Sequence, residues 1–151
     1  MAEAALMPPQ TEEIALHLVG SEALSEMAPL YVQLDRAHGG KITREQATEK
    51  LGLMLQAGHR AVLFRRQGLA LGMAIWMDMG DHVFLRNFVI DRDHRREGFG
   101  AALFARWRSD LLPAGTKLRL EVGALHAQKF WERQGFSIWS TGMRLDPREG
   151  A

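Results

Sequence analysis

The segment from residue 83 to 122 constrains the fold most, because it alternates between two kinds of hydrophobic pattern. An apolar strand pattern ending at residue 90 precedes the turn RREGFG (95–100), a helical pattern and the alternating strand pattern KLRLEV (117–122). Periods of two and of about 3.6 residues distinguish strands from helices. A strand–helix–strand unit favours a right-handed crossover. We therefore expect its two strands to be parallel in one sheet.

The residues before this unit predict a three-stranded antiparallel meander. AVLF (61–64) and LALGMAIWM (69–77) are separated by the turn RRQG, and the turn DMGD leads into HVFLRNFVI (82–90). Short turns of this kind join neighbouring antiparallel strands. Further strands are expected over 13–19 and 136–145, which makes the predicted sheet mixed but mostly antiparallel.

Two helical patterns lie between the first strand and the meander. The first follows Ser21, an N-cap residue, and contains Pro29, which predicts that the helix is kinked or begins there. The second lies between Thr43 with Gln46, a capping-box pair, and Gly58, which predicts the C-terminal end.

Two more helices are expected in the second half of the chain. Apolar residues recur at helical spacing after the glycine turn until Pro113, which ends that helix. The segment AQKFWERQGF is helical up to Gly135, and we expect Phe136 to pack back on Phe130 or Trp131.

These elements predict an α/β (α+β) fold with a mixed, mostly antiparallel sheet of about six strands and helices on both faces. A chain of 151 residues is long enough for one domain with a sizeable core. We place this domain at 12–147, after a flexible lead-in at 1–11 and before a frayed terminus at 148–151.

Composition excludes several classes of function. The 19 basic and 18 acidic residues leave a net charge of +1, which gives no electrostatic footprint for nucleic acid. The chain has no cysteine, so a disulfide framework, a thiolate metal site and a cysteine nucleophile are excluded. No apolar run approaches a membrane span, and the first residues do not resemble a signal peptide. We expect a cytoplasmic protein with no metal, since the six histidines are scattered.

The turn RREGFG has the properties of an anion site. Amides in the first turn of a helix have no intrahelical partner, and the helix dipole adds partial positive charge there. Glycines allow a ligand to approach the backbone, and two arginines add charge. A phosphate is the natural occupant, and the alternative is a tight turn without a ligand.

Two other phosphate motifs do not fit this turn. A P-loop requires a lysine followed by serine or threonine, but position 103 is Leu103 and the helix contains no lysine. A dinucleotide fingerprint requires a third glycine, which is missing from GFGAAL.

The pattern R-x-x-G-x-G, after a strand ending VID and before an apolar helix, resembles the acyl-CoA-binding motif of the GNAT superfamily of N-acetyltransferases. AQKFWERQGF (127–136) is similar to the segment of this family that follows the fifth strand. The order of elements from 13 to 146 matches as well, so the resemblance covers nearly the whole chain.

The resemblance implies a site for acetyl-CoA, the acyl donor. The fourth strand would lie along the pantetheine arm, and the loop and helix start would hold the pyrophosphate. Trp131 would line the cofactor or substrate cavity, or pack in the core. The residues implied for cofactor binding are Phe88, Val89, Ile90, Arg95, Arg96, Glu97, Gly98, Phe99, Gly100, Ala101 and Trp131.

Two departures from the family pattern bear on the chemistry. Ala124 stands where the family often has an asparagine that bonds the cofactor, and Trp131 stands where many members have a tyrosine acid. An indole N–H donates a hydrogen bond but is not a usable acid. Candidates for the general base are His126, which is slightly preferred, Glu121 and His82.

The resemblance implies an N-acyltransferase that moves acetyl from acetyl-CoA to a primary amine by direct attack. The acceptor would be a small amine or a protein amino group, and a homodimer is left open. Two alternatives remain: a CoA-binding module with little or no activity, and a nucleotide-phosphate binder without acyl chemistry. Asp35, Asp78 and Asp81 are either contacts for a cationic substrate or turn and surface charges.

Overall fold

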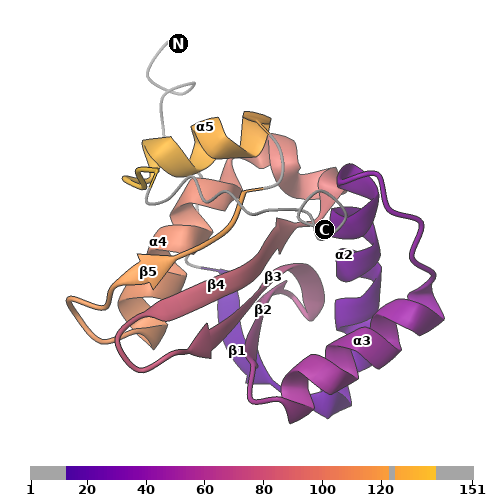
Figure 1. Ribbon diagram of the computed structural model, residues 1–151. Coiled ribbons are helices and arrows are strands. Elements are labelled where there is room, and N and C mark those ends of the chain that lie inside the picture. The colour runs from indigo at the N-terminus through magenta and orange to yellow at the C-terminus, as the bar shows by residue number, and fades with distance from the viewer. Residues whose placement is uncertain (1–12, 123–124, 139–151) are drawn as a thin grey trace, which may run out of the picture. The chain divides into compact units, whose positions relative to one another are not determined.

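The computed structural model describes residues 13–122 and 125–138 (Figure 1). The chain divides into two compact units between Glu121 and Val122. The first unit contains the sheet and most helices, and the second contains one short helix, described below by itself. No helix among the described residues is long and apolar enough to cross a membrane.

The first unit is built on a five-stranded sheet in the order β1-β2-β3-β4-β5. The pairs β1–β2, β2–β3 and β3–β4 are antiparallel, and β5 is parallel to β4 as the sequence predicts. The strands are β1 (Ala15–Val19), β2 (Arg60–Arg66), β3 (Leu69–Asp78), β4 (Val83–Ile90) and β5 (Leu118–Arg119).

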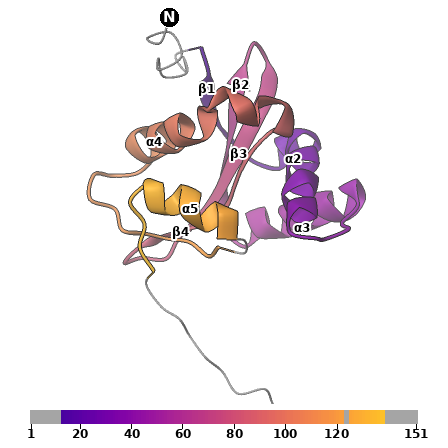
Figure 2. The same cartoon turned by 90° about the horizontal axis from the view of Figure 1, so that it is seen from above.

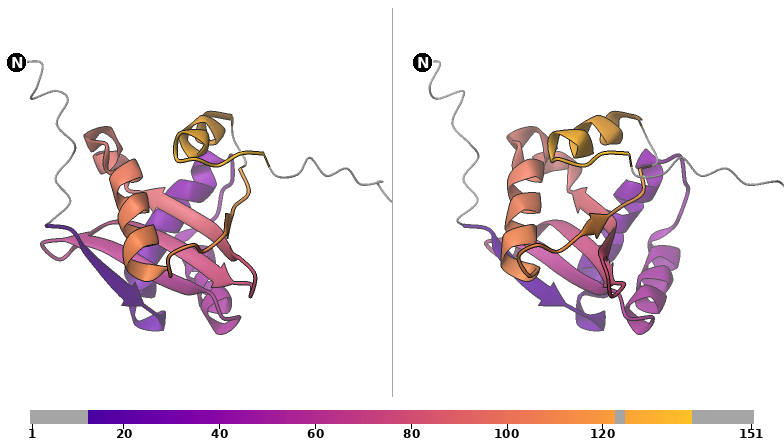
Figure 3. Two further views of the ribbon diagram at one scale, coloured as in Figure 1. Left: turned by 90° about the vertical axis from the view of Figure 1, so that its left-hand side faces the viewer. Right: turned by 60° about the vertical axis from the view of Figure 1, so that its left-hand side comes forward.

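Helices cover both faces of this sheet, which confirms the predicted fold class. Figures 2 and 3 show α2 (Leu24–Ala37) and α3 (Arg44–Gln56) on one side of the strands and α4 (Phe99–Leu111) on the other. Two 3₁₀ turns, η1 (Ser21–Ala23) and η2 (Arg92–Glu97), precede α2 and α4.

Alternate strand residues point to opposite faces of the sheet, so their side chains belong to two separate cores, one on each face. On the α2–α3 side, Leu63, Met73, Ile75 and Val89 belong to one buried cluster with Met27 and other helical residues. On the α4 side the core is aromatic: Trp76 packs edge-on against Trp107 at 5.4 Å between ring centroids. Pairs of this geometry contribute about 0.5–1.5 kcal/mol beyond burial.

Helix α2 starts earlier than Pro29, so of the two alternatives for this residue, a kink or a helix start, the start is wrong. Ser21 lies in η1, and the helix runs from Leu24 through Pro29 to Ala37. Proline has no N–H to offer the carbonyl four residues earlier. The carbonyl of Ser25 instead accepts a hydrogen bond from Arg44 at 3.2 Å, which offsets this loss.

The predicted ends of α3 are confirmed. The hydroxyl of Thr43 accepts from the Gln46 amide at 3.1 Å, and the Gln46 side chain accepts from the Thr43 amide at 2.9 Å. At the other end, Gly58 has a φ of 103°, and the next amide donates to the Met54 carbonyl at 3.1 Å. This left-handed glycine and 6→1 bond form a Schellman motif.

Fewer strands are present in the described residues than expected. The strand predicted over 117–122 is only Leu118–Arg119. Of the strand predicted over 136–145, residues 136–138 are not in a strand, and the rest lies outside the described residues.

Gly72 allows β3 and β4 to approach closely at the end of β4. It pairs with Ile90, and a Cβ added to it would lie 2.5 Å from the Val89 carbonyl oxygen. A backbone atom at that distance must shift. The absence of a side chain at this position therefore helps to fix where β4 ends.

We predict that Gly72→Ala lowers the free energy of unfolding by about 1–3 kcal/mol, the usual cost of overpacking. Gly52→Ala is the matched control, because its Cβ would meet only a Leu24 methyl at 3.9 Å within a helix. There alanine should stabilise by about 0.5–1 kcal/mol. Urea denaturation of both variants measures the two changes, and equal changes would contradict this account.

Candidate functional site

Strand β4 contains a bulge next to the residues implied for cofactor binding. Ile75 pairs with Asn87 and Trp76 pairs with Leu85, so Arg86 is an extra residue on β4. A bulge bends its strand and re-aims the residues beside it, and bulges are frequent next to active sites. No pattern in the sequence indicates this irregularity.

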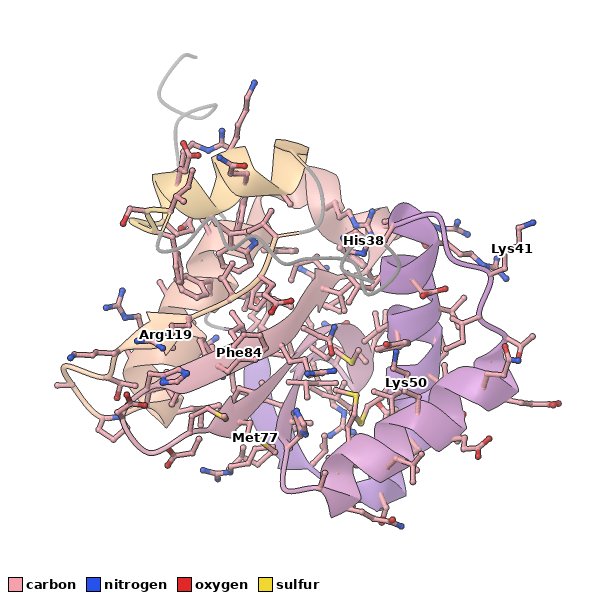
Figure 4. The ribbon with its side chains drawn as sticks, viewed as in Figure 1. His38, Lys41, Lys50, Met77, Phe84 and Arg119 are labelled. Atoms are coloured by element: carbon pink, nitrogen blue, oxygen red, sulfur yellow. The ribbon has the colours of Figure 1, made fainter. Side chains whose placement is uncertain are left out.

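Strands β4 and β5 are paired only at the start of β4. The parallel register joins Val83 to Leu118 and Phe84 to Arg119, and it does not continue along β4 in the described residues (Figure 4). On its other side β4 remains paired with β3 as far as Ile90. One edge of β4 therefore separates from its neighbouring strand just before the bulge.

The three strand residues predicted to bind the cofactor also fill the core, as expected. Val89 and Ile90 are buried, and Val89 lies in the α2–α3 cluster. The ring of Phe88 packs against Phe64 at 5.7 Å and against Phe104 at 6.0 Å. Their side chains hold the strand in place, which leaves the backbone groups on the edge away from β3 for the role that the resemblance implies.

The loop after β4 is organised by its first residue. The Asp91 amide donates to the Leu71 carbonyl at 2.7 Å, and its carboxylate accepts from the Asp93 amide at 3.2 Å. The side chain of Arg95 turns back, and its Nε donates to the Ile90 carbonyl at 2.9 Å. Arg95 therefore ties the loop to the end of β4.

The two glycines of the turn have different conformations. Gly98 is left-handed, with a φ of 75°, and is the N-cap of α4. Helix α4 begins at Phe99, so Gly100 is already helical and lies in the first turn, not before the helix as expected. Only Gly98 is needed for the shape of the chain. Gly100 therefore has no backbone reason to be glycine.

Phe99 anchors the start of α4. Its side chain is buried, and the Arg66 guanidinium lies 5.3 Å from its ring centroid. The first-turn amides of Phe99, Gly100 and Ala101 follow Gly98, and Ala101 is exposed. An anion here would meet backbone donors and the positive end of a 13-residue helix. The side chains of Arg96 and Glu97 lie outside the described residues.

The loop also has a partner on another element, which no pattern in the sequence predicts. Gln33, on α2, donates from Nε2 to Asp91 Oδ1 at 2.6 Å and accepts from the Arg92 amide at 2.9 Å. These residues are 58 and 59 positions apart. No local pattern could join them.

The candidate bases are in different settings. Glu121 is exposed at the end of the first unit, and the side chain of His126 lies outside the described residues. His82 contacts Asp81 at 2.6 Å, and this hydrogen bond is the main reason that the pKa of Asp81 is lowered. His82 is thus engaged with a neighbouring carboxylate.

Two of the three aspartates considered for a cationic substrate accept hydrogen bonds from nearby backbone amides. Asp35 accepts from the Ile42 amide at 3.0 Å, and Asp78 accepts from the Gly80 amide at 2.9 Å. These bonds agree with the alternative that the aspartates are turn and surface charges and not contacts for a substrate. Among the described residues, no three His, Asp or Glu side chains gather as a metal site requires.

The second unit contains α5 (Leu125–Arg133), which ends as predicted. Gly135 has a φ of 102°, the Phe136 amide donates to the Trp131 carbonyl at 3.1 Å, and the Gly135 amide donates to the Glu132 carbonyl at 3.0 Å. The rings of Trp131 and Phe136 lie 5.5 Å apart. Trp131 is therefore the apolar partner within a Schellman motif.

The first unit also has a hollow on the α3 side of the sheet. It is an open groove of about 650 Å³ between the end of β1, η1, the start of α2, the end of α3 and the start of β2. Leu18, Leu24, Leu55 and Ala61 give it an apolar lining, and Glu22 and His59 add polar groups.

Comparison with known proteins identifies the fold around the loop. A family model described as an acetyltransferase (GNAT) domain matches residues 57–138, which is more than half of the chain. The matched range includes β3, β4, the loop, α4 and α5. A comparison with curated proteins found no match.

Solved structures share this fold at low sequence identity. An acetyltransferase from Thermus thermophilus is 20% identical with a TM-score of 0.70, covering 87% of this chain and 90% of its own. Ribosomal-protein-alanine N-acetyltransferase from Brucella melitensis is 17% identical with a TM-score of 0.67, covering 88% and 99%. Aminoglycoside N-acetyltransferase AAC(6')-Iy, solved with CoA, is 18% identical with a TM-score of 0.67, covering 94% and 99%.

The family match spans the bulged strand, the loop and the helix start whose geometry suits an anion. The chain therefore belongs to the GNAT acetyltransferase family.

Proposed function

We propose that the protein transfers an acetyl group from acetyl-CoA to a primary amine by direct attack. The amine nitrogen forms a bond to the thioester carbonyl carbon, and the carbon–sulfur bond breaks. The nitrogen loses a proton, and the departing thiolate takes one. A covalent enzyme intermediate is not required, and the chain has no cysteine to form a thioester with the enzyme.

The observation that carries this proposal is the geometry of β4 and α4. The ladder between β4 and β5 stops after Phe84, and the loop delivers the chain to the N-terminus of a 13-residue helix. In our proposal the pantetheine amides bond the backbone groups of Phe88, Val89 and Ile90 that face the edge of β4 away from β3. The amides of the loop and helix start, from Gly98 to Ala101, hold the pyrophosphate.

The charged residues of the loop have a secondary role in this proposal. Arg95 uses its Nε to bond the Ile90 carbonyl. A guanidinium has five N–H donors, so it can tether the loop and still bond a phosphate oxygen. Arg96 and Glu97 complete the cradle through their backbone amides.

Proton transfer is assigned to His126 or Glu121 as the base, with His126 preferred. Trp131 cannot be the acid, and its contact with Phe136 agrees with a packing role. A thiol has a pKa near about 8.5, so a thiolate leaves without full protonation. A general acid contributes roughly 10²–10⁴-fold, whereas proximity contributes on the order of 7–11 kcal/mol. Transfer without a tyrosine acid is therefore slow but feasible.

A CoA-binding module with little activity is the second candidate. The sequence observations that favour it are Trp131 at the usual acid position and Ala124 at the usual asparagine position. Such a protein would bind CoA through the same loop and serve as a sensor or assembly partner.

The acceptor is proposed only as a small amine or a protein amino group. Two of the structural relatives carry names that specify protein alanine and aminoglycoside acceptors, and these names describe those proteins. The cytoplasmic location, the homodimer and the domain limits of 12–147 stay predictions.

The function is tested by measuring thiol release from acetyl-CoA in the presence of a panel of amines, beside melting curves with CoA. We expect amine-dependent thiol release and a higher melting temperature. A ligand at about 100 times its Kd adds roughly 2.7 kcal/mol to stability. Stabilisation without thiol release would favour the binding module. No stabilisation by millimolar CoA would contradict both, and competition with ATP would identify a nucleotide binder.

The helical conformation of Gly100 allows a sharper test of the anion site. Gly100→Ala adds one Cβ where the backbone is already helical, so it should fold and melt at or above the wild-type temperature. If the pyrophosphate lies against this amide, CoA should bind at least about tenfold more weakly by calorimetry. Arg95→Ala should have a smaller effect on affinity, because the backbone forms the site. A folded Gly100→Ala protein with unchanged affinity would exclude pyrophosphate from the helix start.

A further inference from the structure

We propose that Gln33 is a positioning residue for the cofactor loop, an inference that rests on the function proposed above. Gln33 lies on α2, which covers the α2–α3 side of the sheet. Its carboxamide donates to Asp91 Oδ1 at 2.6 Å and accepts from the Arg92 amide at 2.9 Å. The two bonds hold the side chain and the backbone of successive loop residues.

Asp91 is the residue at which β4 changes into the loop. Its amide is bonded to the Leu71 carbonyl on β3, and its carbonyl accepts from the His94 amide at 2.9 Å. One carboxylate oxygen caps Asp93, and the other accepts from Gln33. Asp91 therefore connects β3, α2 and η2 through four hydrogen bonds.

The orientation of the Gln33 carboxamide is determined by its partners. The Arg92 amide can only donate, so the atom that faces it is the oxygen. The nitrogen then faces the carboxylate of Asp91, which accepts. Only a side chain with a donor and an acceptor side by side can make both bonds. A carboxylate at this position would place two negative oxygens at the same 2.6 Å contact.

The two hydrogen bonds of Gln33 hold the start of the loop that leads to the proposed pyrophosphate site. Residues Arg92–Glu97 form η2 and Gly98 is the N-cap of α4, so a change at Asp91 moves the amides of the helix start. Donors must be fixed within about 0.5 Å to bind a ligand well. Arg95 provides a second tether from inside the loop, to Ile90. Gln33 is the side-chain tether that comes from helix α2, beside the backbone bond from Asp91 to β3.

The test is a polarity swap between the two side chains. Gln33→Glu loses the N–H group that donates to Asp91. Asp91→Asn leaves a single acceptor oxygen for two donors, the Gln33 carboxamide and the Asp93 amide, so the NH2 group introduced at position 91 faces one of these donors. Combining the two substitutions restores every bond. The NH2 group introduced at position 91 donates to one oxygen of the carboxylate introduced at position 33, and the other oxygen of that carboxylate accepts from the Arg92 amide. The side-chain oxygen at position 91 accepts from the Asp93 amide. Gln56→Glu, on the exposed end of α3, is the matched control for added charge.

Two readouts are needed: CoA affinity by calorimetry, and hydrogen exchange of the amides from 92 to 98 without ligand. We expect each single variant to bind CoA about tenfold more weakly and to exchange these amides faster, with the double variant returning close to wild type. The control should match wild type in both readouts. Melting curves check that all variants are folded.

Each contrary result has a distinct meaning. If wild type binds CoA and Gln33→Glu binds it equally well with unchanged exchange, Gln33 does not position the loop. If the single variants are impaired and the double variant is not rescued, the paired carboxamide and carboxylate are not the cause, and the inference fails. If wild type itself does not bind CoA, the proposed function fails first.

Discussion

The pairing of β4 with its two neighbours is the constraint on which the site depends. Strand β3 holds β4 along its length to Ile90, whereas in the described part of the chain β5 pairs only with Val83 and Phe84. A strand held on one side and released on the other offers a fixed backbone edge to a ligand. The bulge at Arg86 and the close approach at Gly72 set the direction and the end of that edge. Gly72 and Arg86 matter through the backbone and not through chemical groups of their own.

The two sides of the sheet make different contributions to this constraint. The aromatic cluster on the α4 side includes Phe88, Phe104 and Trp107, so the packing of α4 and the position of β4 are joined. On the other side, Val89 lies in the α2–α3 cluster, and Gln33 reaches from α2 to the loop. Both helical layers therefore fix the transition from β4 to α4.

Much of the fold follows from local signals in the sequence. The capping box at Thr43 starts α3, and the glycines at 58 and 135 end α3 and α5, as predicted. Each signal depends on hydrogen bonds between residues close in the chain. The meander and the parallel return of β5 follow from periodicity and from the crossover rule. The loop is also recognisable as a candidate anion site, since a helix start needs no distant partner to present amides.

The features that the sequence could not predict depend on contacts between residues far apart in the chain, or on the register in which two strands pair. Helix α2 runs from Leu24 through Pro29, and the Ser25 carbonyl that the proline leaves without a helical partner accepts from Arg44, 19 positions away. The bulge depends on how two strands align, and Gln33 reaches Asp91 across 58 positions. The expected position of Gly100 before the helix is wrong because the pattern does not show which of two glycines is left-handed.

Hydrogen exchange with and without CoA shows whether the edge of β4 and the start of α4 bind the cofactor, because it reports backbone amides one segment at a time. We expect slower exchange at 98–101 and along the end of β4 when CoA binds. Slower exchange confined to the groove between β1, η1 and α3, at 18–24 and 55–61, would place the ligand elsewhere and contradict the account.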